Sequence, residues 1–255
     1  GRSATLPPSE AFIEREARPN ESPDGRPGYI LQITDRKRTE LDYWLVVRIR
    51  KGILPIPTTA VFDAFPKDRV EYSVKVENTP IQLFGDGYEE ITEIFERRMY
   101  GIPRMDGFFH VEEKFGIGKG VAGGNFLIMA DSRGSALLAS ETALDAIKEI
   151  PYVTGRIAAS GSKVGGHSYR NAVATTNDAY CPCISDKVEH SEVGSDVNCV
   201  YEIIVNGLDL EQVKTAMKAG IEKAKDVHGV KRITAGSYGG KLGSGRIHLL
   251  DLVGH

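Results

Sequence analysis

Apolar and polar residues follow the clearest pattern in the second part of the chain. Two short apolar runs predict buried strands, and four weaker runs predict further strands; the ranges are 126–130, 199–205, 156–160, 169–176, 230–235 and 246–250. Asn206 and Gly207 form a turn-favouring pair, which predicts that the strand at 199–205 ends there. Between these runs, apolar residues at helical spacing predict two helices.

The residues before each predicted helix favour a helix start. Ser132 can cap a helix that runs to about Ile150, in which four small residues permit close packing: Ala136, Ala139, Ala143 and Ala146. Asp209, with Gln212 three residues later, resembles a capping box for a helix that extends toward His228. The resulting order contains a βαββαβ unit with one further strand, which predicts an α+β sandwich.

The first part of the chain has a weaker pattern. The Pro-rich stretch at 7–27 predicts a long ordered loop or a flexible arm. A strand is expected at 29–34, followed by a helix that carries Leu41, Leu45 and Ile49 and ends near Gly52. Weak alternation around residues 70–76 suggests strands. This part can hold the remains of a second βαββαβ unit.

The composition narrows the class of protein. The chain has 255 residues, 41% hydrophobic and 26% charged, with a formal net charge of -3, and its charges form no long block. These values argue against a nucleic-acid partner. No apolar run is long enough to predict a membrane span, and the first residues lack the layout of a signal peptide. The three cysteines form no disulfide framework, so we expect a cytoplasmic protein.

Three glycine-rich loops each contain one lysine: Lys119, Lys163 and Lys241. Such loops suit the binding of extended anionic substrates, although a solvated surface lysine is the commoner explanation for any single one. Gly118, Gly120 and Gly123 have the spacing of a dinucleotide-binding loop. The loop at 116–124 precedes a predicted strand rather than a helix, which argues against a nucleotide. A ligand-binding turn and a purely structural turn both fit the spacing.

Other common catalytic groups find little support in the sequence. The six histidines are scattered without metal-ligand spacing, so no metal is expected. Cys181 and Cys183 flank Pro182, which predicts a turn rather than the helix N-terminus that activates a thiol.

Glu202 stands out because it interrupts an apolar strand, where alternation places it on the face of Val200 and Ile204. In apolar surroundings the pKa of a carboxyl rises, so this residue could stay protonated and donate a hydrogen bond. The alternative is a glutamate at a sheet edge or subunit interface.

Eight ordered blocks resemble the formylmethanofuran:tetrahydromethanopterin formyltransferase family. They contain residues 24–28, 57–60, 84–88, 119–126, 159–165, 176–178, 200–203 and 233–236. The resemblance implies two ferredoxin-like lobes, which we place at 1–106 and 107–255, and a homo-oligomer, often a tetramer, with clefts near subunit contacts. It implies transfer of a formyl group from methanofuran to N5 of tetrahydromethanopterin, with these two carriers as substrates and no bound cofactor or metal.

The resemblance also implies roles for individual residues. Glu202 matches the family's catalytic glutamate. We expect substrate binding by residues of the matched blocks and lysine loops: Lys119, Gly120, Gly123, Gly124, Asn125, Ser160, Ser162, Lys163, Thr176, Asn177, Tyr201 and Lys241.

Two departures from the family pattern keep an alternative open. The first lobe lacks the initial strand and helix of the pattern, and Ile53, Leu54 and Ile56 stand near positions where the family has cysteines. A non-catalytic relative that binds a pterin or methanofuran, or serves as an assembly subunit, is therefore the alternative function.

Overall fold

The structure is a computed structural model that describes residues 9–164, 175–236 and 245–254. The chain divides into two compact units, Gly1–Lys119 and Gly120–His255, which we call unit 1 and unit 2. The expected α+β class with two lobes is confirmed. The lobe boundary after residue 106 stays a prediction.

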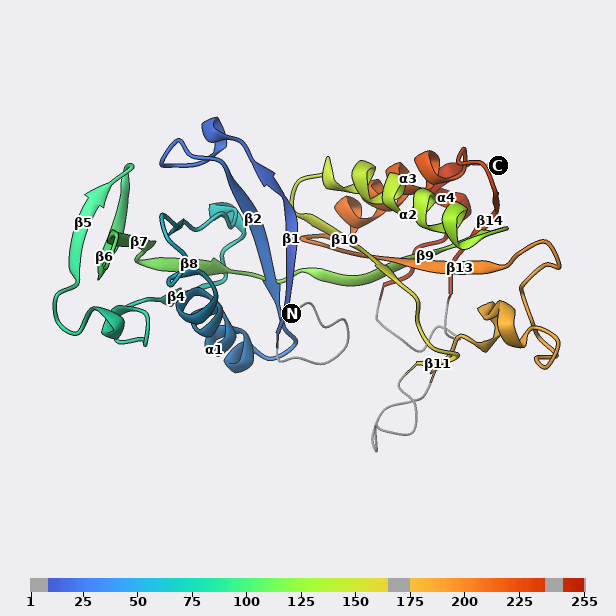
Figure 1. The fold of residues 1–255 in the computed structure, drawn as a ribbon, viewed down its shortest axis with the longest axis horizontal. Coiled ribbons are helices and arrows are strands. Elements are labelled where there is room, and N and C mark those ends of the chain that lie inside the picture. Colours follow the sequence, from blue (N-terminus) through green and yellow to red (C-terminus); the bar gives the residue numbers. More distant parts are fainter. Residues whose placement is uncertain (1–8, 165–174, 237–244, 255) are drawn as a thin grey trace. The chain divides into compact units, whose positions relative to one another are not determined.

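Unit 2 contains the predicted βαββαβ unit. Its sheet has the strand order β10-β13-β9-β14, and all neighbouring strands are antiparallel, which is the ferredoxin-like topology. Figure 1 shows both long helices on the same face of this sheet. The elements are β9 (Val121–Ala130), α2 (Arg133–Lys148), β10 (Val153–Ala158), β13 (Cys199–Gly207), α3 (Leu210–Ala224) and β14 (Val230–Thr234).

Strand alternation gives the sheet of unit 2 two different faces. Phe126, Ile128, Ile203 and Val205 are fully buried against α2 and α3. Helix α2 has small buried residues, which allow the neighbouring elements to pack closely against it: Ala136, Ala139 and Ala143. The side chains between these strand positions project from the opposite face, which carries the polar residues described below.

Both predicted helix caps in unit 2 are confirmed. The Ser132 hydroxyl accepts a hydrogen bond from the Ser135 amide at 3.1 Å, and the Asp209 carboxylate accepts one from the Gln212 amide at 2.9 Å. The reciprocal bond of a capping box is not made, because the Oε1 atom of Gln212 is buried without a hydrogen-bond partner in the part of the chain that the structure describes.

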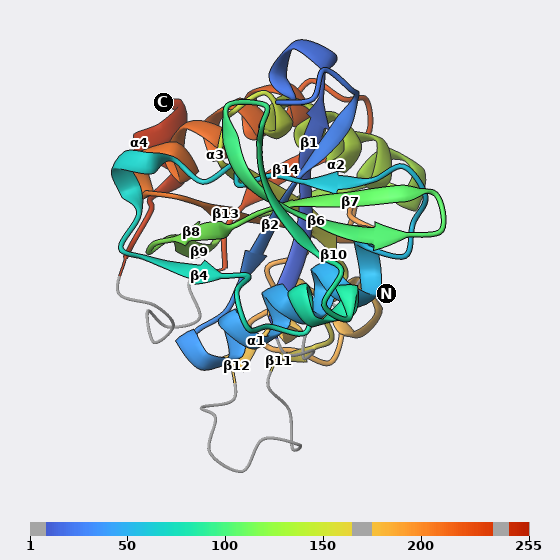
Figure 2. The same cartoon turned by 90° about the vertical axis from the view of Figure 1, so that its left-hand side faces the viewer.

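Unit 1 consists of small sheets around α1. Two antiparallel pairs, β1-β2 and β4-β8, accompany a sheet of order β3-β7-β6-β5, of which β6 and β7 are labelled in Figure 2. The elements are β1 (Glu10–Ala17), β2 (Gly28–Thr34), α1 (Arg38–Arg48), β3 (Ala60–Val61), β4 (Tyr72–Lys75), β5 (Glu90–Ile94), β6 (Arg97–Arg104), β7 (Gly107–Glu112) and β8 (Lys114–Ile117). The core includes Leu45, Ile49, Ile102 and Phe109.

The prediction of a loop or arm at 7–27 is wrong for β1. This strand pairs with β2 along its length, and Gln32 donates a 2.7 Å hydrogen bond to the buried carboxylate of Glu14. The sequence did not predict this strand, because polar pairs across to β2 take the place of the apolar alternation that usually identifies a strand. The charged residues of β1 and the prolines on either side of it favoured a loop instead.

The glycine-rich segment at 116–124 is mostly strand rather than loop. β8 includes Gly116, β9 begins at Val121, and a short link at 118–120 joins them. The strand at 199–205 continues through Asn206 and Gly207, where a register shift lets Gly207 pair with Val121.

Two further boundaries differ from expectation. Instead of a strand at 246–250, the chain forms the short helix α4 (Leu249–Val253), because Leu249 and Leu252 pack on the core of unit 2 one helical turn apart. Gly52 does not cap α1, which continues directly into a π-helical turn, Ile49–Ile53. Of the strand expected at 169–176, residues 169–174 lie outside the described residues, and Thr175–Thr176 form β12.

Candidate active site

Glu202 lies in the middle of β13, the strand between β10 and β9. Its paired residues are Ala158 on β10 and Leu127 on β9, so its side chain projects from the face opposite the helices. Val200 and Ile204 share this face with it, as strand alternation predicted. The residue is only 8% exposed. A buried carboxyl on a central strand needs hydrogen-bond partners, because its burial without them costs about 2 kcal/mol or more.

Two polar side chains hold the carboxyl of Glu202. The Asn125 amide nitrogen donates to Oε1 at 2.9 Å, and the Ser160 hydroxyl donates to Oε2 at 3.0 Å. Asn125 belongs to β9, where it pairs with Ile204, and Ser160 follows the end of β10. The two partners reach the carboxyl from opposite sides of β13, Asn125 from β9 and Ser160 from the segment that follows β10. The structure thus brings together three residues that the sequence singled out.

The segment after β10 is fixed by a second strand pair. β11 (Lys163–Val164) pairs with β12 (Thr175–Thr176), and the Asn177 amide donates a 2.8 Å hydrogen bond to the Ser162 carbonyl. The four backbones that therefore lie together are those of Ser162, Lys163, Thr176 and Asn177. The first of these residues, Ser162, follows Ser160 by two positions in the sequence.

Asn177 has an unusual environment for an amide. It is 6% exposed, and its Oδ1 atom is buried without a hydrogen-bond partner within the described ranges. Its carbonyl accepts a hydrogen bond from the Cys181 thiol, with the sulfur at 3.2 Å. Burial, with smaller contributions from Cys183 and Asp178, raises the pKa of Cys181, which favours the unreactive thiol and agrees with the absence of a cysteine nucleophile from our interpretation.

The glycines of β9 differ in what surrounds them. A Cβ on Gly124 would lie 2.6 Å from Val213 Cγ1, and one on Gly120 would lie 3.0 Å from the Gly207 carbonyl oxygen, so close packing accounts for both. Gly123 has open space around its Cα and a φ of +91°, and its amide donates to Asn206 Oδ1 at 2.9 Å. Of the three, Gly123 alone offers space to a ligand.

Three other predicted residues are not part of the group around Glu202 that the structure describes within unit 2. Tyr201 points to the helix face, where it packs near Cys199, and the proximity of Cys199 followed by burial raises the pKa of the phenol. Lys119 is exposed in unit 1, with its Nζ atom 3.4 Å from Glu71. Lys241 lies outside the described residues.

Sequence reasoning missed three polar residues on the face of Glu202. Arg156 pairs with Ile204 and Thr154 pairs with Asn206, so all three polar side chains project from this same face. Alternation within one segment could not identify them, because their place beside Glu202 follows from the register of β10 against β13.

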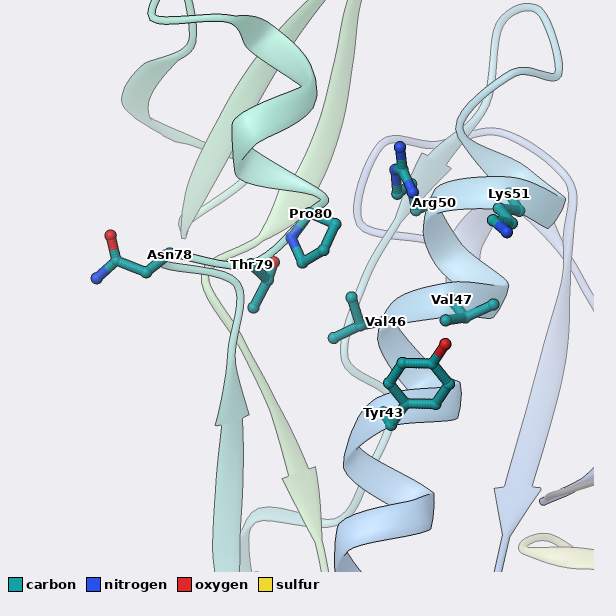
Figure 3. Close-up of a pocket in the computed structure, with 8 residues that line it drawn as sticks. All are labelled: Tyr43, Val46, Val47, Arg50, Lys51, Asn78, Thr79 and Pro80. Atoms are coloured by element: carbon teal, nitrogen blue, oxygen red, sulfur yellow. The ribbon is translucent and has the colours of Figure 1, made fainter.

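The cavities of unit 1 do not contain this chemistry. One encloses about 290 Å³ between α1 and the turn at 78–80, where Val46 projects toward Thr79 and Pro80 (Figure 3). Another encloses about 760 Å³ and is lined by charged residues that include Arg97 and Glu112. Glu202 lines neither cavity, and we base the site on its hydrogen bonds.

Searches of the described residues for two other features gave negative results. No group of three or more His, Cys, Asp or Glu side chains in this part of the chain could hold a metal ion. Likewise, none of the helices within these residues combines the length and the apolar character that crossing a membrane requires.

Comparison with protein families matches almost the whole chain in two parts. Residues 1–104 match the family described as formylmethanofuran-tetrahydromethanopterin formyltransferase, and residues 107–252 match that described as its proximal lobe. The formyltransferases of Methanocaldococcus jannaschii and Methanothermus fervidus are each 49% identical, over 99% of this chain and 85% of the relative.

Two solved structures resemble the fold. The formylmethanofuran:tetrahydromethanopterin formyltransferase of Methanosarcina barkeri is 46% identical, with a TM-score of 0.90 over 99% of this chain and 85% of that chain. The formyltransferase/hydrolase complex of Methylorubrum extorquens, solved with methylofuran, contains a chain that is 33% identical, with a TM-score of 0.84 over 99% and 84% of the two chains.

Proposed function

The chain belongs to the formylmethanofuran:tetrahydromethanopterin formyltransferase family, and from this premise we propose that Glu202, held by Asn125 and Ser160, is its catalytic residue. The enzyme moves a formyl group between methanofuran and tetrahydromethanopterin, two carriers of one-carbon metabolism in methanogenesis. The single observation that supports the role of Glu202 is its buried carboxyl, which is fixed by two side chains on a central strand.

The reaction sets three requirements. N5 of the pterin attacks the formyl carbon, negative charge develops on the formyl oxygen, and the departing amine nitrogen of methanofuran gains a proton. Glu202 meets the last requirement by passing the proton lost from N5 to the departing nitrogen. The sum is a transfer of one formyl group and one proton in opposite directions, with no covalent enzyme intermediate.

Asn125 and Ser160 prepare Glu202 for this role. Each donates to a different carboxyl oxygen, so together they fix the rotation of the carboxyl plane. Much of the rate enhancement in such a transfer comes from holding the reacting groups in place before the reaction. The buried position of Glu202 excludes bulk water from one side of the carboxyl.

Carrier binding belongs to the same proposal. The segment with Ser162, Lys163, Thr176 and Asn177 is suited to contact a carrier, because it adjoins Ser160 through the pairing of β11 with β12. Gly123, on the same sheet, has open space beside its Cα. Lys119 and Lys241 would orient anionic parts of the carriers, whereas Gly120, Gly124 and Tyr201 support the sheet from within.

The alternative of a non-catalytic relative is less well supported. High identity extends over almost the full chain to enzymes of this name, and the glutamate is present with two side-chain partners. A binding subunit would have no need to fix a buried carboxyl in this way, at the energetic cost of its desolvation.

Three further properties complete the proposal. We expect a homo-oligomer, a dimer or a tetramer, and sedimentation at micromolar concentration should show a species larger than the monomer. We expect no bound prosthetic group, since formyl transfer between amines includes no redox step. A cytoplasmic location agrees with the three free cysteines.

A spectrophotometric formyl-transfer assay with both carriers tests the proposal. Glu202→Ala and Glu202→Gln should each lower kcat by about 100-fold or more, because neither side chain can accept a proton and pass it on. The exposed Glu141 on α2 provides the control, and Glu141→Ala should leave kcat unchanged. Equal kcat in the wild type and Glu202→Ala would remove this residue from the mechanism.

A further inference from the structure

The sheet of unit 2 places an arginine beside the catalytic glutamate. Arg156 pairs with Ile204, which lies two residues beyond Glu202 on β13 and therefore on the same face. In an antiparallel sheet such a diagonal neighbour is about 7–8 Å away between Cα atoms, which is within reach of an arginine side chain.

The neighbours of Glu202 on this face have short side chains. Two of them, Asn125 and Ser160, already bind the carboxyl. The residue directly beside Glu202 on β10 is Ala158, whose side chain is a single methyl group. Arg156 itself is half-buried, with its Nε atom fully buried, so its guanidinium group starts from the sheet surface rather than from open solvent.

The reaction requires a partner for the negative charge that develops on the formyl oxygen. The formyl oxygen acquires negative charge during transfer, and Asn125 and Ser160 are occupied by Glu202. Among the described strands of unit 2, β14 also carries an arginine on this face, Arg232, which forms an ion pair with Glu192 at 3.1 Å. Arg156 is the arginine that the register places two residues from the pairing position of Glu202.

We propose that Arg156 is a second catalytic residue, which binds the formyl oxygen through its guanidinium group as that oxygen becomes negative. The inference rests on the proposed function, because it takes Glu202 as the centre of the reaction. The N5 lone pair forms the new C–N bond, and the carbonyl electron pair moves to oxygen, where Arg156 stabilises it. The pair then returns, the bond to the departing nitrogen breaks, and that nitrogen receives the proton through Glu202.

A guanidinium group is well suited to this task. It stays charged at any physiological pH, so its effect does not depend on a titration. Its planar donors can bind an oxygen that changes from a carbonyl to an oxyanion without moving. The interaction is stronger in the transition state than in the ground state, so its loss should lower kcat more than it raises KM.

The experiment measures kcat and KM of Arg156→Ala and Arg156→Lys in the formyl-transfer assay. Arg156→Ala should lose about 100-fold in kcat, the scale of one removed oxyanion donor, and Arg156→Lys should lose less because it keeps the charge. Millimolar guanidinium chloride should restore part of the activity of Arg156→Ala, which a purely structural role would not allow. Arg232→Gln is the matched control and should retain wild-type kcat.

The outcomes separate this inference from the proposed function. If Arg156→Ala is folded by circular dichroism and keeps wild-type kcat while Glu202→Ala is inactive, the role of Arg156 is wrong and that of Glu202 stands. If Arg156→Ala does not fold, Arg156→Lys decides, because unchanged kcat with this variant and no response to guanidinium would overturn the inference. Wild-type kcat in Glu202→Ala overturns the proposed function itself.

Discussion

The hydroxyl of Ser160 lies 3.0 Å from Oε2 of Glu202 and donates a hydrogen bond to it, although Ser160 follows the end of β10, Glu202 lies within β13, and most of the irregular region of unit 2 separates them in the sequence. This contact depends on the register in which Ala158 pairs with Glu202, because a shift by one residue would turn Glu202 toward the helices. The position of the catalytic carboxyl is therefore a property of the whole sheet.

The Ser160 hydroxyl should act only through Glu202. Ser160→Ala removes one donor to the carboxyl, and we expect kcat to fall about tenfold, which corresponds to the ~1.4 kcal/mol of a hydrogen bond to a charged or polar group. In a Glu202→Ala background the same substitution should have almost no further effect, since the group that it positions is gone. Kinetics of the two single variants and the double variant measure this coupling, and additive losses would show that Ser160 acts independently.

Gly124 should tolerate no side chain. A Cβ there would lie 2.6 Å from Val213 Cγ1 and 3.1 Å from Met217 Sδ, so Gly124→Ala must push α3 away from the sheet. We expect a loss of about 1–3 kcal/mol in the free energy of unfolding, the usual cost of overpacking.

The matched control for Gly124→Ala is the same change at Gly134 on α2, where a Cβ meets only the Ser132 hydroxyl at 3.9 Å. Gly134→Ala should leave stability unchanged or raise it slightly, because alanine favours helix. Thermal unfolding followed by far-ultraviolet circular dichroism compares the two. Similar melting temperatures for both variants would contradict the close packing at Gly124.

The sequence predicted the part of the fold in which local and global preferences agree. In unit 2 the capping residues Ser132 and Asp209 and the apolar faces of both helices sufficed to place α2 and α3. β1 was missed because its pattern depends on a partner strand, and α4 because Leu249 and Leu252 respond to a core that is formed by distant segments.

The same distinction applies to the site. Alternation identified Glu202 as an anomaly within one strand, a purely local signal. Arg156 and Asn206 become visible only when the register of β10 against β13 is known, because neither is unusual in its own segment. Tyr201 shows the reverse case, since its place next to Glu202 in the sequence puts it on the opposite face of the sheet.

Asp63 should make the stability of unit 1 depend on pH. Burial raises the pKa of its carboxyl, and Glu112 nearby adds to the rise, while hydrogen bonds from the Gly116 and Phe65 amides oppose it. A raised pKa in the fold means that the folded state binds the proton more tightly. This contribution is complete below the ordinary pKa of aspartate, about 3.9, and disappears as the pH rises through the value in the fold.

The variant Asp63→Asn isolates this effect, because asparagine does not titrate. The stability of the wild type relative to the variant should therefore decrease as the pH rises from about 4 toward neutrality. Urea midpoints followed by fluorescence measure it, since Trp44 on α1 is the only tryptophan in the chain and reports on unit 1. A difference between the two proteins that stays constant with pH would show that the pKa of Asp63 is not raised.

Arg104 should be the residue on which the loop at 54–59 depends most. Its Nη1 atom donates to the carbonyls of Leu54 and Ile56 at 2.7 and 2.8 Å, and its Nε atom lies 2.9 Å from the Asp106 carboxylate. The Arg104 side chain is 9% exposed. Asp106 in turn accepts a 2.9 Å hydrogen bond from the Thr58 amide, so one buried guanidinium group connects the end of β6 to both sides of this loop.

Replacement of Arg104 by alanine would leave the two loop carbonyls without their donor, and we expect unit 1 to lose about 2 kcal/mol or more. Arg104→Lys should recover only part of this loss, because a single ammonium group cannot reproduce the planar set of donors. Arg98 supplies the control: it is exposed, its contact with Glu113 is 3.5 Å, and Arg98→Ala should change stability by about 0.5 kcal/mol or less. Urea unfolding followed by Trp44 fluorescence should separate the two alanine variants by their midpoints at equal m-values. Coincident midpoints would mean that the loop is held by its backbone alone and that Arg104 contributes no more than an ordinary surface arginine.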